Sequence, residues 1–336
     1  SPVSGNVSLN PDGALNQAIT LHQLLSIHPI SRQSKYRKGN PLLVDLVVVD
    51  EASMIDLPLF VQFLEAIPDE AHVLILGDAQ QLPAIEAGNI LDGLLNSAAT
   101  DAYSMLLQKA HLRLQKNYRQ LHHPGLSQFA QDCLLDDADA ITEKLSDNAY
   151  EHVSWHGAGS HAMAESIQHA ISHYSKLPLC ENADAALKCA KQFTILTAVR
   201  DGPYGCKAIN AEIARKLNPS FQALFHGQLL LITENAKHLG LANGDTAVIW
   251  RQANLPLMAC FENNGRLETI ALSALPAYEL AYALTIHKSQ GSEYGEVAVI
   301  LPEQDNPVLS KALLYTAFTR ARQKLRIIAS AEILRS

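Results

Sequence analysis

Two apolar runs that end in acidic residues constrain the fold more than any other feature of the chain. Leu46–Val49 runs directly into Asp50 and Glu51, and His72–Leu76 is followed within two residues by Asp78. Apolar runs rich in β-branched residues and without polar alternation predict strands that are buried on both faces, as in parallel sheets. Ligands of parallel sheets bind at the carboxyl ends of the strands, so both acidic segments are expected at a ligand site.

The acid pair has a chemical and a structural interpretation. An aspartate at a strand end can hold Mg²⁺ against nucleotide phosphates, and an adjacent glutamate can orient or deprotonate the water that attacks the γ-phosphate. Asp50 and Glu51 therefore indicate nucleotide hydrolysis, or else they cap the helix predicted from Met54 to Ile67. The core-facing side of that helix is expected to consist of Leu57, Phe60, Val61, Leu64 and Ile67.

Composition excludes several classes of protein. The chain has 336 residues, of which 48% are hydrophobic and 18% charged, so it is expected to bury a full core in two or more domains. It has no apolar run long enough to span a membrane and no amino-terminal signal pattern, so a cytoplasmic protein without a membrane partner is expected. Five cysteines without CxxC spacing predict free thiols rather than a metal site. A net charge of −8 argues against general polyanion coating but allows a local basic track.

The order of predicted elements indicates an α/β protein with an insertion. Residues 42–98 alternate strand, helix and strand, which is typical of a βαβ unit. A second α/β segment begins at Phe193 and returns after residue 278, with a helix from about Pro307 to Arg320. Between them, residues 219–277 predict short strands and hairpin turns, hence a small antiparallel barrel. Residues 120–190 are helical in pattern and predict no site.

Three further segments carry groups suited to phosphates. Arg119 and Arg320 come from separate parts of the sequence, and an arginine delivered to the transferred phosphoryl group accelerates NTPases by about 10³–10⁵; alternatively, each is a solvated surface residue. Leu284–Glu293 offers hydroxyls, a cation and backbone N–H groups. The segment His28–Pro41 contains four basic residues and no acidic one, so it is either a hairpin that contacts duplex or single-stranded DNA or a solvated loop.

Six motifs in this order resemble those of the superfamily 1 DNA helicases. They are TLHQLL, VVVDEASMID, GDAQQLPA, NYRQ, LTIHKSQGSE and YTAFTRAR. Within and near them, four sequences most resemble those of the RecD subunits of exodeoxyribonuclease V, namely DEASMIDLP, IEAGNIL, IHKSQGSE and YTAFTRAR. The resemblance covers nearly the whole chain and is weakest across 98–190. It implies an α/β fold with two RecA-like P-loop NTPase-type domains: an incomplete first domain at 1–118, with a basic pin hairpin at 28–41, and a second at 119–218 and 278–336. An SH3-like β-barrel would be inserted at 219–277.

The resemblance also implies individual roles. Asp50 would bind Mg²⁺, Glu51 would activate water, and Gln81 would sense the γ-phosphate. The other expected nucleotide contacts are Asp78, Gly291, Glu293 near the ribose, and the arginines Arg119 and Arg320 at the γ-phosphate. The expected DNA contacts are Thr20, His22, Arg32, Lys35, Tyr36, Arg37, Lys38, Thr285, His287 and Lys288; the alternative role for Thr20 is structural capping.

These roles imply the motor portion of an ATP-dependent 5′→3′ DNA helicase subunit of exodeoxyribonuclease V, acting in double-strand break repair and recombination. ATP and Mg²⁺ would be its cofactors, single-stranded DNA and duplex ends its substrates, and RecB and RecC its partners in a heterotrimer. The alternatives are a stand-alone superfamily 1 helicase and a non-catalytic fragment that binds DNA or protein.

One departure from the family pattern bears on activity. The 336 residues contain no G-x-x-x-x-G-K-[ST] sequence, and Lys288-Ser289 is preceded by His287 instead of glycine. The family places this phosphate-binding loop upstream of the position of Thr20. We therefore expect a truncated first motor domain that hydrolyses ATP negligibly by itself.

Overall fold

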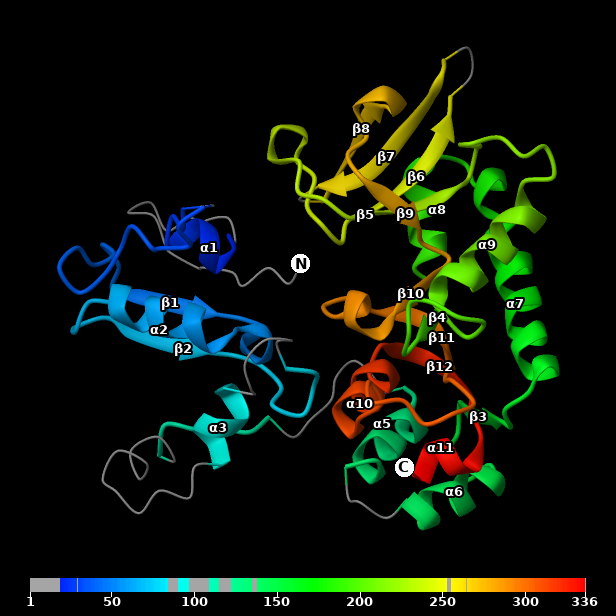
Figure 1. Ribbon diagram of the computed structural model, residues 1–336, viewed down its shortest axis with the longest axis horizontal. Helices are drawn as coiled ribbons and strands as arrows, with labels where there is room; N and C mark the ends of the chain where they lie inside the picture. The colour runs from blue at the N-terminus through cyan, green and yellow to red at the C-terminus, as the bar shows by residue number, and fades with distance from the viewer. Residues whose placement is uncertain are drawn as a thin grey trace. The chain divides into compact units, whose positions relative to one another are not determined.

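The computed structural model describes residues 19–28, 30–83, 90–96, 109–114, 122–134, 138–252, 255–263 and 265–335. Its contacts divide the chain into two compact units, residues 2–115 and residues 116–336 (Figure 1). The described part of the first unit contains a two-stranded sheet, and that of the second contains two five-stranded sheets. Arg119 and its NYRQ motif lie outside the described residues.

The sheet of the first unit joins the two strands that precede the acidic segments. β1 (Leu46–Val49) and β2 (His72–Ile75) pair in parallel, with Val49 opposite Ile75. Their carboxyl ends therefore lie at the same edge, as predicted. The described helices of this unit are α1 (Leu21–Leu24), η1 (Ala52–Met54), α2 (Leu57–Ala66) and α3 (Ile90–Asn96).

Helix α2 begins later and buries a different face than predicted. Asp56 caps it, because its Oδ1 accepts a hydrogen bond from the Leu59 N–H at 2.7 Å. The interpretation of Asp50 and Glu51 as the caps of this helix is therefore wrong. The buried face consists of Leu59, Phe60, Phe63 and Ala66, whereas the predicted core residues Leu57, Val61 and Leu64 are exposed. The sequence LPLFVQFLEA is apolar almost all round, so hydrophobicity alone does not select its buried face.

The strands of the first unit are less buried than their apolar sequences indicate. Val47 and Val49 are buried, but Leu46, Val73 and Leu74 are 46%, 37% and 49% exposed. Burial on both faces, as predicted, is therefore wrong for β2. Among the described residues this sheet has only these two strands, so the side chains of β2 lack a further neighbouring strand.

The second unit contains a parallel sheet with helices on it, as expected of the second α/β segment. Its strand order is β10-β4-β11-β12-β3. All residues of β4 are buried, because it lies between β10 and β11 and packs against α7, α8 and α9, while α5 and α10 pack against other strands of the sheet (Figure 1). The strands are β3 (Val153–His156), β4 (Phe193–Thr197), β10 (Ala283–Thr285), β11 (Tyr294–Ile300) and β12 (Ala321–Ile328).

The helices of the second unit differ from prediction in one boundary. α10 spans Lys311–Phe318 instead of beginning near Pro307, because Ser310 caps it and accepts a hydrogen bond from the Leu313 N–H at 3.2 Å. The other helices are α5 (Pro124–Asp132), α6 (Ala138–Ser146), α7 (Ser160–Tyr174), η2 (Leu177–Leu179), α8 (Ala183–Ala190), α9 (Cys206–Leu217), η3 (Lys237–Leu239), η4 (Leu272–Ala274), η5 (Ile286–Ser289) and α11 (Ala331–Arg335). No helix in the described part of the chain is long and apolar enough to cross a membrane.

The inserted antiparallel sheet contains the short strands predicted within residues 219–277. Its strand order is β8-β7-β6-β5-β9, and its edge strands β8 and β9 are not paired with each other among the described residues. Closure into an SH3-like barrel therefore stays a prediction. The strands are β5 (Leu229–Ile232), β6 (Thr246–Arg251), β7 (Leu257–Asn263), β8 (Arg266–Ala271) and β9 (Tyr278–Leu280).

A buried amide fixes the junction between the two sheets of the second unit. β9 continues through two residues into β10, and Asn210 on α9 lies against this connection. Its Nδ2 donates to the carbonyls of Leu280 at 3.1 Å and Ala283 at 2.8 Å, and its Oδ1 accepts from the Ala283 N–H at 2.8 Å. The inserted sheet therefore leaves the parallel sheet at a rigid point.

Candidate nucleotide and DNA sites

The acid pair lies in a tight turn at the carboxyl end of β1. Glu51 adopts a left-handed backbone conformation (φ 53°, ψ 42°), and Asp50 Oδ1 accepts a hydrogen bond from the Glu51 N–H at 2.8 Å. The Ala52 N–H then donates to the Leu76 carbonyl at the end of β2, at 3.0 Å. A left-handed non-glycine residue costs of order 1–3 kcal/mol, and such strain clusters at functional sites; Glu51 is one of six such residues in the described part of the chain. The turn therefore positions both carboxyl groups at the strand ends at a cost in backbone strain.

Gly77 permits this turn to pack against the second strand end. A Cβ at this position would lie 3.0 Å from the Ala52 nitrogen and 3.3 Å from that of Ser53, and 2.9 Å from Leu91 Cδ2. Such contacts would force the acid turn and the end of β2 apart. Glycine is thus required by close backbone approach at this point.

Asp78 and Gln81 form a connected pair immediately after Gly77. Asp78 Oδ1 accepts from the Gln80 N–H at 3.0 Å, and its Oδ2 accepts from Gln81 Nε2 at 3.2 Å. The carboxylate therefore orients the Gln81 amide at the same sheet edge as the acid pair. The first unit brings together four of the predicted nucleotide residues, namely Asp50, Glu51, Asp78 and Gln81.

The basic segment 28–41 is anchored at its middle and exposed elsewhere. Arg37 and Asn40 form a two-residue hairpin, with N–H to carbonyl distances of 3.0 and 2.7 Å. Arg32, Lys35, Arg37 and Lys38 are exposed, whereas Tyr36 is half-buried and packs against the core of the unit. The predicted hairpin is thus confined to a short tip, and the cations, more than Tyr36, are available to a ligand.

Thr20 and His22 form a short capped helix in the first unit. Thr20 Oγ1 accepts from the Gln23 N–H at 3.3 Å, and Gln23 Oε1 accepts from the Thr20 N–H at 3.1 Å. This reciprocal capping box confirms that Thr20 caps the helix, and its contact with DNA stays a prediction. His22, one residue from the buried Leu21, is exposed.

In the second unit, the predicted nucleotide residues gather around the end of α10. Arg320 is 2% exposed, and its guanidinium donates to the carbonyls of Thr316 at 3.1 Å and Ser292 at 3.2 Å. Ser292 lies between Gly291, which has φ +73°, and Glu293, which forms an ion pair with Arg322 at 3.8 Å. The loop 289–293 and Arg320 are therefore held together.

The predicted DNA contacts of this unit line a cavity at the carboxyl ends of β4 and β10. The cavity has a volume of about 470 Å³, and its wall includes Thr285, His287, Lys288 and Arg200. Thr285 Oγ1 accepts from the Lys288 N–H at 3.4 Å, as a cap of η5. Burial lowers the pKa of His287, so its imidazole is neutral near pH 7.

Three charged residues in or next to this cavity were not predicted: Arg200 and Asp201 in its wall, and Glu279, which pairs with two of its cations. Arg200 lies three residues beyond β4, a position at which a polar side chain could have been singled out. Glu279 on β9 accepts from Arg200 at 3.2 Å and forms a close ion pair with Lys288. Its partner Arg200 is 79 residues away in sequence, so no local pattern indicates the contact.

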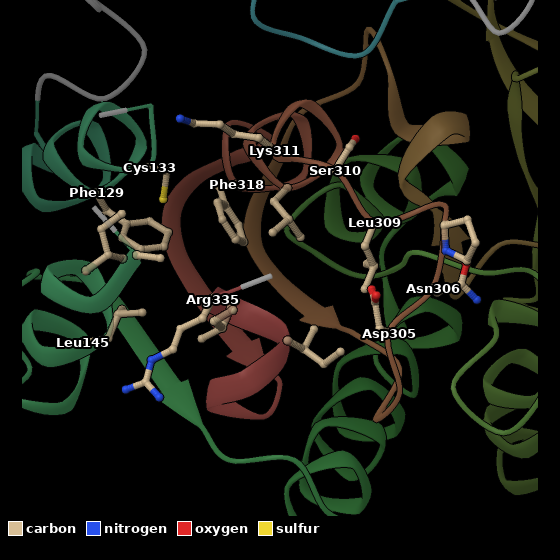
Figure 2. Close-up of a pocket in the computed structure, with 16 residues that line it drawn as sticks. Phe129, Cys133, Leu145, Asp305, Asn306, Leu309, Ser310, Lys311, Phe318 and Arg335 are labelled. Atoms are coloured by element: carbon tan, nitrogen blue, oxygen red, sulfur yellow. The ribbon is translucent and has the colours of Figure 1, made fainter. Parts of the chain in front are cut away.

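A second cavity lies at the amino-terminal end of α10 and contains none of the predicted residues. Its volume is about 410 Å³, and Phe129, Leu145, Leu309 and Phe318 contribute to its apolar wall (Figure 2). The rings of Phe129 and Phe318 pack at a centroid distance of 4.9 Å. In the described residues, no three acidic, histidine or cysteine side chains converge on a metal site.

Family models match both units. Residues 8–87 match the AAA domain, and residues 280–328 match the UvrD-like helicase C-terminal domain. The first match contains the acid pair and Gln81, and the second contains the cavity residues Thr285–Lys288 and Arg320.

Curated relatives extend the similarity over nearly the whole chain. The RecBCD enzyme subunit RecD of Mycobacterium tuberculosis is 32% identical over 328 residues, covering 95% of this chain and 55% of the relative. The ATP-dependent RecD2 DNA helicase of Deinococcus radiodurans is 29% identical over 322 residues, covering 94% of this chain and 40% of the relative. The chain thus spans about half the length of the curated relatives it matches.

One solved structure shares the fold. It is described as the basis of DNA unwinding at forked duplex DNA by two coordinating Pif1 helicases; it has a TM-score of 0.50 and 17% identity, and covers 92% of this chain and 77% of that one. At this identity the likeness concerns the fold alone. The six motifs, the two family models and the RecD relatives show that the chain is RecD-like, with the motifs of the superfamily 1 helicases.

Proposed function

We propose that the chain is the motor portion of an ATP-dependent 5′→3′ DNA helicase subunit of an exodeoxyribonuclease V, acting in double-strand break repair and recombination. The observation that carries the proposal is the strained turn of Glu51 beside Asp50, at the edge where Asp78 orients Gln81. Helix capping does not explain the two carboxyl groups, because Glu51 precedes η1 without a side-chain hydrogen bond to it and α2 is capped by Asp56. Hydrolysis of a nucleotide does explain them.

The residues of the first unit fit a magnesium nucleotide. Asp50 is exposed, and the hydrogen bond from the Glu51 N–H engages only its Oδ1, so the carboxylate suits Mg²⁺, which takes one or two carboxylates with phosphates and water. When bound, Mg²⁺ would neutralise charge on the β- and γ-phosphates of ATP. Glu51 would accept the proton of the attacking water, and Gln81 would donate its amide to the γ-phosphate.

The second unit would supply the remaining nucleotide contacts. Arg320 would stabilise the charge of the transferred phosphoryl group, with Gly291 and Glu293 contacting the nucleotide; Arg119 would be the second arginine. Because Arg320 is buried and bonded to Ser292, its guanidinium would have to exchange those carbonyl acceptors for phosphate oxygens. Its tether to the loop 289–293 would couple that exchange to the neighbouring segment.

The DNA contacts would come from both units. Thr20, His22 and the exposed cations of segment 28–41 would contact DNA from the first unit, and Thr285, His287 and Lys288 from the second. We assign the incomplete first motor domain to 1–118, the second to 119–218 and 278–336, and an SH3-like barrel to 219–277. The two separate sheets of the second unit support an insertion, although β9 (Tyr278–Leu280) pairs with β5 and extends the inserted sheet beyond residue 277.

Two partner arrangements follow from the relatives. The RecD relative is a subunit of the RecBCD enzyme, which favours a heterotrimer with RecB-like and RecC-like subunits. The Deinococcus relative is named as an ATP-dependent DNA helicase, so a stand-alone motor is the second candidate. Co-expression of the tagged protein with RecB-like and RecC-like subunits tests this directly. Stable co-purification supports the heterotrimer, and recovery of an active monomeric helicase supports the alternative.

The catalytic proposal is tested on the polypeptide encoded by the complete reading frame. Glu51→Gln should keep ATP binding but lower DNA-stimulated hydrolysis by at least about a hundredfold, because it removes a group that acts only in the transition state. Asp56→Asn, a neighbouring exchange that keeps a helix cap, is the matched control. Near-normal turnover of the Glu51 variant would contradict the assigned role.

A further inference from the structure

Glu279 joins two cations from separate segments of the second unit. Its Oε2 accepts from Arg200 at 3.2 Å, and its Oε1 forms a close ion pair with Lys288 Nζ. The carboxylate comes from β9 of the inserted sheet, whereas Arg200 follows β4 and Lys288 lies in η5. The side chain of Glu279 is 24% exposed, so the bridge is reachable from solvent.

Both cations also line the 470 Å³ cavity at the carboxyl ends of β4 and β10. Thr285 and His287 line the same cavity, and Glu279 does not. Each cation therefore pairs with Glu279 and also borders the cavity, whose wall further carries the carboxylate of Asp201, paired with Lys207 at 2.7 Å. The cavity is large enough for a phosphate group and has a hydroxyl nearby.

A carboxylate that engages two cations through its two oxygens resembles a phosphodiester, which presents two charged oxygens in the same way. We propose that Glu279 takes the place of a backbone phosphate of single-stranded DNA between Arg200 and Lys288, and that DNA displaces it. The inference rests on the proposed function of Lys288 as a DNA contact, and it adds Arg200 as a phosphate-binding residue. Glu279 then lowers the affinity of this site for DNA, because DNA must displace it.

The exchange requires only a side-chain movement. Asn210 holds the Leu280 carbonyl, one residue from Glu279, together with both polar backbone groups of Ala283. The backbone of β9 is therefore held near the bridge, so only the Glu279 side chain would have to move once its two ion pairs are exchanged. DNA would thus replace an ion pair between the two sheets without separating them.

The test measures binding of a fluorescent oligothymidylate to the 336-residue chain by anisotropy, without nucleotide. Glu279→Gln should bind roughly two- to five-fold more tightly, because phosphate no longer competes with a partly exposed ion pair. Arg200→Ala and Lys288→Ala should each weaken binding and reduce the salt dependence by about 0.7 in slope. In either alanine background, the gain from Glu279→Gln should shrink, because one partner of the bridge is missing.

Glu262→Gln is the matched control. Glu262 also lies in the inserted sheet and forms an ion pair with Lys191 at 3.1 Å, so this exchange removes the same charge away from the cavity. Equal gains from the two variants would overturn the proposal, since the effect would be one of net charge. If Lys288→Ala weakens binding but Glu279→Gln gains nothing over Glu262→Gln, the phosphate-mimic role is wrong and the DNA role of Lys288 stands. Failure of every variant and of the parent chain to bind would overturn both.

Discussion

Thr20 in the first unit and Thr285 in the second begin short helices in the same backbone conformation. Their φ and ψ angles are −73° and 154°, and −72° and 150°. Each hydroxyl accepts a hydrogen bond from the N–H three residues on, and the next residue, Leu21 or Ile286, is 1% or 0% exposed. A histidine follows in both turns. The pattern Thr-apolar-His thus has the same N-cap conformation twice, before an α-helical turn at Thr20 and before a 3-10 turn at Thr285.

The two turns differ in what holds them in place. The Thr20 turn is closed by its own capping box with Gln23, whereas the Thr285 turn continues directly from β10 of a five-stranded sheet. Asn210 also holds Ala283 two residues before Thr285. The same short pattern is thus positioned by local hydrogen bonds in one unit and by long-range packing in the other. We expect the second turn to be the more rigid.

The largest expected effect is that of truncating the buried residue of each turn. Ile286→Ala and Leu21→Ala should each cost about 2–5 kcal/mol in the free energy of unfolding, because each leaves a cavity in a core. The two tryptophans, Trp155 and Trp250, both lie in the second unit, so their fluorescence reports that unit alone.

Urea unfolding followed by fluorescence and by circular dichroism separates the two effects. Ile286→Ala should lower the fluorescence midpoint, and Leu21→Ala should change only the dichroism. Val308→Ala, at a side chain that is 41% exposed, is the control for the second unit. A fluorescence change of equal size in Leu21→Ala would mean that the units do not unfold separately.

The next effect tests whether the Thr285 turn depends on a distant anchor. Asn210→Ala should cost about 1–3 kcal/mol, because it leaves the buried N–H and carbonyl of Ala283 without their partner. Asn218→Ala, at the C-cap of the same helix, is the matched control, since its amide bonds only the exposed backbone of Gln222. Similar losses for the two variants would show that the junction between the sheets is not specially stabilised by Asn210.

A smaller effect is expected from the two caps. Thr20→Ala and Thr285→Ala should each cost about 1 kcal/mol, and the Thr→Ser variants should retain most of the stability. Gln23→Ala should add to the loss only in the first turn, because only that turn has a capping box. The same urea experiments measure all five variants. A Thr285→Ala variant as stable as the parent would mean that β10 alone fixes the turn.

The parts of the fold that follow from local pattern were predictable, and those that depend on distant contacts were not. The parallel β1–β2 pair and strands β5 to β8 of the inserted sheet follow from apolar runs and turn residues, whereas β9 was not predicted. The buried face of α2 was not predictable, because its sequence is apolar almost all round. The roles of Glu279 and Asn210 depend on partners 70 residues or more along the chain. No feature of the sequence predicted the left-handed backbone conformation of Glu51, since that conformation is rare outside glycine.

The smallest expected effect is the contribution of His287, the half-buried histidine of the second turn, to the pH dependence of the stability of the second unit. Burial lowers the pKa of His287, and also those of His169 and His173 on α7. Because the folded-state pKa is below the unfolded value of about 6.5, the unfolded chain binds more protons as the pH falls. Stability of the second unit should therefore be complete above that value and decline as the pH drops through it.

Tryptophan fluorescence in urea, repeated between about pH 7.5 and 5.5, measures the decline. His287→Gln should make it shallower, with His161→Gln, at a side chain that is 86% exposed, as the background exchange. If both variants show the decline of the parent chain, His287 does not contribute to it, and the second turn is buried less tightly than its hydrogen bonds and packing indicate.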